Sequence, residues 1–147
     1  KKQLRSELDT DPDLKTKRDL LISIPGISDT TISIILAELD FQKFESVREV
    51  VAFMGLAPKD KISGTSVKGK PRLCKIGNAR LRKCFYMPAM VAIRFNPIVA
   101  EFHRRLKENG KNGKVIVCAA MRKLVHIIYG VLKTGKPFNP HYAQNIA

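Results

Sequence analysis

Residues 96–137 read NPIVAEFHRRLKENGKNGKVIVCAAMRKLVHIIYGVLKTGKP and predict two consecutive helices. Asn96 followed by Pro97 is typical of a helix start, because the Asn side chain accepts from free backbone N–H groups and proline has no N–H to satisfy. The first helix ends in the polar run at 107–110, and the second extends over about residues 114–133. Because this second helix is apolar for most of its length, we expect it to belong to a compact core.

Helices are also expected upstream of this pair, separated by one long loop. The expected segments are a polar helix ending near Asp11, a helix over 13–23, a helix capped by Ser28 or Asp29, a helix with a Ser46–Glu49 capping box that runs through Phe53, and a helix over 78–95. Pro88 lies inside the last of these and is expected to kink or split it. Residues 55–77 are rich in Gly and Pro and predict a loop or short hairpin. The fold class is therefore all-α: a compact helical domain with one long basic loop that contains glycine.

The turn Ile24-Pro25-Gly26-Ile27-Ser28 resembles the hairpin of a helix-hairpin-helix motif, which would occupy about residues 20–40. In such a hairpin the free N–H groups at the start of the second helix hold a DNA phosphate, and the helix dipole favours the anion. Gly26, Ile27 and Ser28 are the candidates for that contact. Ser28 stands where the usual motif has a second glycine. The pattern fits equally a packing element without a ligand.

Positive charge is concentrated in the later part of the chain. Lys and Arg total 27 against 13 Asp and Glu, which gives a formal net charge of +14. Residues 1–49 carry a net charge of −2, whereas residues 50–147 carry 19 basic and 3 acidic side chains. An excess of this size predicts a polyanionic partner, of which nucleic acid is the commonest.

The stretch 59–83 is the strongest candidate for phosphate contact, with nine basic side chains and one acid. Its serines, Ser63 and Ser66, lie where cations would neutralise the charge of an attacked phosphate, but the residue pattern does not choose between them. A flexible basic loop that only adds affinity is the alternative. The cations expected to touch nucleic acid are Lys68, Arg72, Lys75, Arg80, Arg82 and Lys83.

A further group of cations is spread over the last two predicted helices: Arg104, Arg105, Lys107, Lys111, Lys114, Arg122 and Lys123. These cations would extend a nucleic-acid surface or form a solvated helix face. His126 lies among apolar residues and is expected to pack in the core, as are Phe85, Tyr86 and Met87.

Metal, disulfide and membrane chemistry are not indicated. The three cysteines, Cys74, Cys84 and Cys118, form an odd set without a close pair, which argues against a disulfide framework or zinc site and fits a reducing cytoplasm. The histidines have no metal-ligand spacing, so no metal ligand is expected. We also expect no apolar run to reach the length of a membrane span. The chain begins Lys1-Lys2-Gln3, which predicts a piece of a longer protein. Residues 1–19 would be the end of a linker or coiled coil, and residues 20–147 one domain.

Three ordered runs resemble one family of transposases. They are Gly55-Leu56-Ala57-Pro58, Ser63-Gly64-Thr65-Ser66-Val67-Lys68-Gly69 and Arg72-Leu73-Cys74-Lys75-Ile76-Gly77-Asn78-Ala79-Arg80-Leu81-Arg82. With the turn at 24–27, the Asn96-Pro97 start and the last helix, they are similar to the Tnp domain of insertion-sequence transposases of the one-ten, one-sixteen and nine-oh-two group, the bridge-RNA-guided recombinases. The likeness covers about residues 20–135, and it departs from the family at Ser28, Cys74 and Ile76.

The resemblance implies a DNA recombinase in which the serine of the Ser-Gly pair, here Ser63, is the nucleophile. Arg72, Lys75, Arg80 and Arg82 would neutralise phosphate, with Arg80 and Arg82 favoured because a helix holds them rigidly. It also implies a second, N-terminal domain that binds a divalent metal such as Mg through four carboxylates, together with a guide RNA, a homo-oligomer and a bacterial cytoplasmic location. Without that domain the fragment would bind nucleic acid and catalyse little. The alternative function is a non-catalytic, basic DNA- or RNA-binding module.

Overall fold

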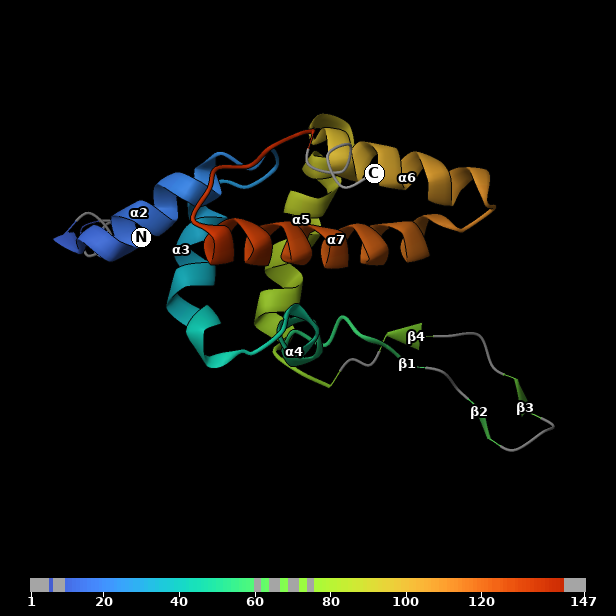
Figure 1. Cartoon of the computed structure of the whole chain (residues 1–147). Coiled ribbons are helices and arrows are strands. Elements are labelled where there is room, and N and C mark those ends of the chain that lie inside the picture. The colour runs from blue at the N-terminus through green and yellow to red at the C-terminus, as the bar shows by residue number, and fades with distance from the viewer. Residues whose placement is uncertain are drawn as a thin grey trace.

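A long C-terminal helix forms the centre of the computed structural model, which describes residues 6, 10–59, 62–63, 67–68, 72–73 and 76–141. This helix, α7 (Gly113–Thr134), contacts four of the other helices, and Figure 1 shows it lying across the middle of the molecule. Its core side chains include Leu124 and Ile128, which are fully buried. The sequence prediction that this apolar helix belongs to the core is confirmed.

Five further α-helices among the described residues surround α7. They are α2 (Pro12–Ile22), α3 (Asp29–Glu38), α4 (Val47–Phe53), α5 (Ala79–Phe95) and α6 (Pro97–Glu108), with a short 3-10 helix η1 (Phe41–Lys43) between α3 and α4. The helices α5, α6 and α7 all contact one another, and α3 packs on both α2 and α5. The fold is therefore helical, as the sequence predicted.

Side-chain caps start the helices largely where the sequence predicted them. The Ser28 hydroxyl accepts a hydrogen bond from the Thr31 amide, Asn78 caps α5 and Asn96 caps α6. The prediction of a capping box at the start of α4 is wrong. Ser46 makes no side-chain cap, and the Glu49 carboxylate instead accepts from the Glu45 amide at 3.0 Å.

Helix α5 continues through Pro88, so the expected split does not occur. Proline removes one hydrogen bond from the helix interior. Buried residues on both sides of it, Phe85 before and Ala89 and Ala92 after, pack against the same core. This shared packing stabilises the two halves as one helix.

Two further expectations about burial are corrected. Tyr86 and Met87 are 51% and 63% exposed, although Phe85 is buried as expected. His126 is also exposed, whereas its neighbours Leu124 and Val125 are buried. These three side chains lie on the outer faces of α5 and α7, because only one side of each helix faces the core.

The expectation that no apolar run is long enough to cross a membrane is wrong for α7. By length and composition alone, its 22 residues would suffice. Buried residues run along α7 from Ile116 to Val131, and the surrounding helices pack on them. The place of α7 in the core accounts for the apolar residues on its buried side.

The long loop contains two short antiparallel ladders. Strand β1 (Pro58–Lys59) pairs with β4 (Arg72–Leu73), and β2 (Ile62–Ser63) pairs with β3 (Val67–Lys68). In Figure 1 these strands lie away from the helices, with β2 and β3 farthest out. The sequence prediction of a loop or short hairpin is therefore met by a hairpin, which we call the basic hairpin (residues 57–76).

Candidate nucleic-acid interface

The two ends of the basic hairpin cross each other where they leave the helices, at a point we call the root (residues 53–56 and 77–78). Gly55 and Gly77 both have positive φ, 69° and 150°, a region that favours glycine. A Cβ placed on Gly77 would lie 2.4 Å from the Phe53 carbonyl oxygen and 2.6 Å from the Gly55 nitrogen. The Asn78 amide donates to the same Phe53 oxygen at 2.8 Å. The root is therefore a close backbone crossing that has no room for a side chain at residue 77.

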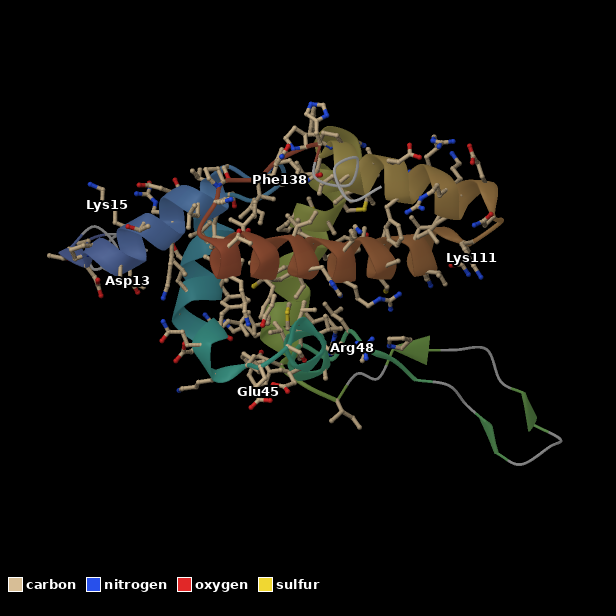
Figure 2. All side chains as sticks on the ribbon, in the orientation of Figure 1. Asp13, Lys15, Glu45, Arg48, Lys111 and Phe138 are labelled. Carbon is tan, nitrogen blue, oxygen red and sulfur yellow. The ribbon has the colours of Figure 1, made fainter. Side chains whose placement is uncertain are left out.

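Two arginines from different helices bind backbone carbonyls in the first segment of the root (residues 53–56). Arg82 of α5 donates from Nη1 to the Met54 carbonyl at 3.4 Å, and Arg122 of α7 donates from Nη1 to the Leu56 carbonyl at 3.3 Å. Each guanidinium keeps further N–H groups for other partners. Figure 2 labels Arg48 on α4, the helix that ends at the root. The root is thus both fixed in direction and positively charged.

We expect replacement of Arg122 by Met to loosen the root while the helical core stays folded. The variant keeps an apolar stem but loses a charge-assisted hydrogen bond, whose loss costs about 1–2 kcal/mol and raises the open population roughly 5- to 30-fold. Amide hydrogen exchange followed by NMR would show faster exchange at Leu56 and Asn78. The control is Lys123→Met, which removes a neighbouring cation that bonds to no carbonyl in the part of the chain that the structure describes. Equal exchange in the two variants would contradict the role of Arg122.

The positive charge of Arg80 is paired with a carboxylate. Its Nη1 lies 3.0 Å from Oε1 of Glu38, whose side chain is only 20% exposed at the end of α3. The Asn78 side chain donates to the other oxygen of Glu38 at 3.0 Å, while its own oxygen caps α5. Glu38 therefore links the start of α5 to α3. The side chain of Arg80 remains 75% exposed, so it can still be approached by an anion.

Ser63 lies on β2 in the outer ladder, where its backbone is opposite Val67 of β3. Lys68 is opposite Ile62 in the same ladder, and Arg72 of β4 is opposite Lys59. The pairing therefore brings the strand that carries Ser63 beside the strand that carries Lys68. Lys75, which the sequence also predicted to contact nucleic acid, lies outside the described residues, as does Ser66.

The turn between α2 and α3 packs against the far end of α5. A Cβ on Gly26, where φ is 105°, would lie 2.9 Å from the Ala92 side chain. The fully buried Asn96 donates to the Pro25 carbonyl at 3.3 Å. Because a helix rises about 1.5 Å per residue, the turn and the root are roughly 20 Å apart along α5. The two regions predicted to contact phosphate are therefore separate sites on one helix.

The turn and Lys83 do share one pocket of about 480 Å³. Its lining includes Gly26, Ile27 and Ser28 on one side and Lys83 with Met87 on the other. The Ile27 amide already donates to the Ile24 carbonyl at 3.3 Å, and Asp29 in the first turn of α3 pairs with Arg18 at 3.1 Å. An anion here would rely on Lys83 together with the first amides of α3, and the acidic side chain of Asp29 would oppose it.

No set of three or more His, Cys, Asp or Glu side chains that could hold a metal occurs within the described part of the chain. Both described acids after residue 50, Glu101 and Glu108, are bound by Arg104. The hydrogen bond that Arg104 donates to Glu101 is the main cause that lowers the pKa of the Glu101 carboxyl.

The sequence matches the model of the transposase IS116/IS110/IS902 family over residues 18–104, which is more than half of the chain. The chain belongs to this family. It is 34% identical over 131 residues to a pilin gene-inverting protein of Moraxella bovis, an alignment that covers 87% of this chain and 40% of that protein. It is 25% identical over 117 residues to an uncharacterized 43.6 kDa protein of insertion element IS110 from Streptomyces coelicolor, covering 79% of this chain and 29% of the relative. The chain thus spans about 40% of the length of the Moraxella relatives it matches.

The most important contacts of this transposase-family domain had no local signal in the sequence. Arg122 and Leu56 are 66 residues apart, and Asn96 and Pro25 are 71 residues apart. The sequence identified Asn96 only as a cap and Arg122 only as one of several surface cations. Glu38 was not singled out at all. Pairing such residues requires the tertiary structure, because nothing in the local pattern shows which distant carbonyl or cation each will meet.

Proposed function

We propose that this chain is the DNA-joining C-terminal domain of an insertion-sequence transposase and that Ser63 is its nucleophile. The observation that carries the proposal is the Ser63-Gly64 pair within the nine basic residues of 59–83, in a chain of this family. The Moraxella relatives are named for the inversion of a pilin gene. Inversion requires DNA strands to be cut and rejoined, and a covalent protein–DNA intermediate conserves the bond between the two events.

In the proposed step, Oγ of Ser63 forms a bond to the scissile phosphorus and one P–O bond of the DNA backbone breaks. The serine gives up its proton, and the departing DNA oxygen takes one up to become a hydroxyl. The product is a phosphoserine ester at one DNA end, so the number of phosphoester bonds is unchanged. A free hydroxyl of the partner strand then attacks this ester and releases Ser63.

The cations around Ser63 would take different roles. Lys68 and Arg72, on the strands of the basic hairpin, would neutralise charge on the attacked phosphate, together with Lys75. Arg82 would mainly hold the root and Arg80 would mainly link α5 to α3, since each already has a partner in the protein, and the exposed side chain of Arg80 would still be open to a phosphate. Lys83 and the turn at Gly26–Ser28 would hold a more distant DNA phosphate.

The other partners are proposed on the family resemblance. They are a guide RNA, further copies of the same protein and a divalent metal such as Mg in an N-terminal domain that the longer relatives would supply. The division into a linker end at 1–19 and a domain at 20–147 belongs to the same proposal. In cells the complex would act in the bacterial cytoplasm, where its DNA substrate lies.

The test is to locate the covalent link in the full-length transposase incubated with its guide RNA and donor and target DNA. Nuclease treatment followed by trypsin should leave a nucleotide on the peptide of residues 62–68, which follows Lys61 and ends with Lys68. Fragmentation of that peptide by mass spectrometry should place the nucleotide on Ser63. A nucleotide on Ser66 would reassign the nucleophile. A protein that binds DNA but forms no adduct would support the non-catalytic binding module instead.

A further inference from the structure

Two cations on neighbouring helices converge on one aromatic ring, away from the basic hairpin. The guanidinium carbon of Arg105 on α6 lies 5.8 Å from the centre of the Phe102 ring, and Nζ of Lys123 on α7 lies 5.6 Å from it. Such cation–π contacts are favourable. They nevertheless bring two positive charges together, and like charges repel each other at short range.

This pair is connected to the root of the basic hairpin through α7. Lys123 directly follows Arg122 on α7, and His126 lies about one turn further along. Partial desolvation lowers the pKa of the His126 imidazole, with the nearby charges of Lys123 and Arg122 lowering it further, so His126 favours its neutral form. Arg122 in turn donates to the Leu56 carbonyl at the root. Arg105, Lys123 and Arg122 therefore place three cations between α6 and the root of the basic hairpin, and we call them the cationic track.

Few acids of the second part of the chain can balance the charge of this track. Residues 50–147 contain three acids, Asp60, Glu101 and Glu108, of which Asp60 lies outside the described residues. The other two are both bound by Arg104. Arg105, adjacent to Arg104 in the chain, makes no salt bridge with a carboxylate among the described residues, although its charge also acts on Glu101 at longer range. Adjacent arginines on one helix thus differ, because Arg104 is paired with two carboxylates whereas, within the described part of the chain, the guanidinium of Arg105 is engaged only by the Phe102 ring and can bind an anion.

We propose that the cationic track formed by Arg105, Lys123 and Arg122 is a second phosphate-binding surface, continuous with the root, that takes the backbone of a DNA duplex. The proposal rests on the DNA-binding function above and extends it to α6 and α7. A bound phosphate would relieve the repulsion among the cations and release counterions from the DNA. A duplex that lies along the track is led directly to the point where the basic hairpin leaves the helices.

A duplex fits this surface better than a single strand does. Proteins that bind single strands use open aromatic faces on which bases stack. On the track the aromatic ring is Phe102, and it is engaged by Arg105 and Lys123 instead. The remaining groups are cations, which contact phosphates without reading or stacking on bases.

The test compares Arg105→Gln with Arg104→Gln in the whole chain. Both replacements lower the net charge by one on the same exposed helix, so they change long-range attraction equally. Binding of a fluorescent 20-base-pair duplex is measured by anisotropy over a range of KCl concentrations, and far-UV circular dichroism checks that each variant is folded. Lys123→Gln is a second track variant, and a single strand of the same length is a second probe.

Arg105→Gln and Lys123→Gln should each lower the slope of log affinity against log salt by about 0.9 and weaken duplex binding roughly 3- to 10-fold, whereas Arg104→Gln should leave the slope unchanged. Equal slopes for Arg104→Gln and Arg105→Gln would overturn the track. A larger effect of Arg105→Gln on the single strand would overturn the assignment to a duplex. If the unchanged chain does not bind DNA, the proposed function itself fails, and the track fails with it.

Discussion

The Ser63→Ala variant of the full-length transposase is expected to form no covalent protein–DNA adduct while it still binds DNA. Alanine has no oxygen to attack phosphorus, so the adduct should fall by roughly 10³-fold or more, as when a catalytic nucleophile is removed. DNA affinity should change by less than about twofold, because the hydroxyl carries no charge and binding depends mainly on cation–phosphate contacts. Adducts are measured on a denaturing gel with labelled DNA, and affinity is measured separately.

Ser66→Ala is the matched control for Ser63→Ala. It removes a second serine hydroxyl, three positions further along the sequence. The adduct should persist in this variant. If the adduct instead survives in Ser63→Ala and disappears in Ser66→Ala, the nucleophile is Ser66. Loss in both variants with weakened DNA binding would indicate a disturbed hairpin rather than a missing nucleophile.

Much of the helical fold could be predicted from local sequence. Asn96-Pro97, Asn78 and Ser28 mark helix starts by a mechanism that acts within a few residues, and the structure has helices that begin just after each of them. Pro88 shows the limit of such reasoning. Its local effect opposes a continuous helix, but burial of Phe85 and Ala92 against one core outweighs it.

The face that each helix turns to the core was harder to predict than the helix itself. His126, Tyr86 and Met87 lie in apolar stretches yet are exposed. Where apolar residues lie on all sides of a helix, the sequence pattern defines no single core face. It therefore does not show which side is exposed to solvent. Only contacts with neighbouring helices decide that.

The residue types of the candidate site could be predicted from the sequence, but their arrangement in space could not. The charge of residues 59–83 and the Ser63-Gly64 pair can be read from the sequence, and the resemblance selects Ser63. The partners of Arg80, Arg82 and Arg122 cannot be read in that way, because each lies at least 28 residues away in the chain. Arg104 and Arg105 look equivalent in the sequence, and only side-chain geometry shows that Arg104 alone is neutralised.

Replacement of Gly77 by Ala is expected to be among the most damaging single changes in the helical domain. The new Cβ would lie 2.4 Å from the Phe53 oxygen, and the φ of 150° is strained for any residue with a Cβ. The neighbours are backbone atoms and cannot turn aside as a side chain would. The clash and the strain together should cost about 2–4 kcal/mol of unfolding free energy, which lowers Tm by roughly 5–15 °C for a domain of this size.

Gly130→Ala provides the control for Gly77→Ala, measured by thermal unfolding in parallel. Gly130 lies inside α7, and a Cβ there would meet nothing within 4 Å. Alanine favours the helix over glycine, so this variant should be about 0.5–1 kcal/mol more stable than the unchanged chain. Opposite signs for the same chemical change would show that the crossing at the root, and not the loss of glycine flexibility in general, governs residue 77. A Gly77→Ala variant as stable as Gly130→Ala would mean that Phe53 and Gly55 move apart easily, and the root would then not fix the direction of the basic hairpin.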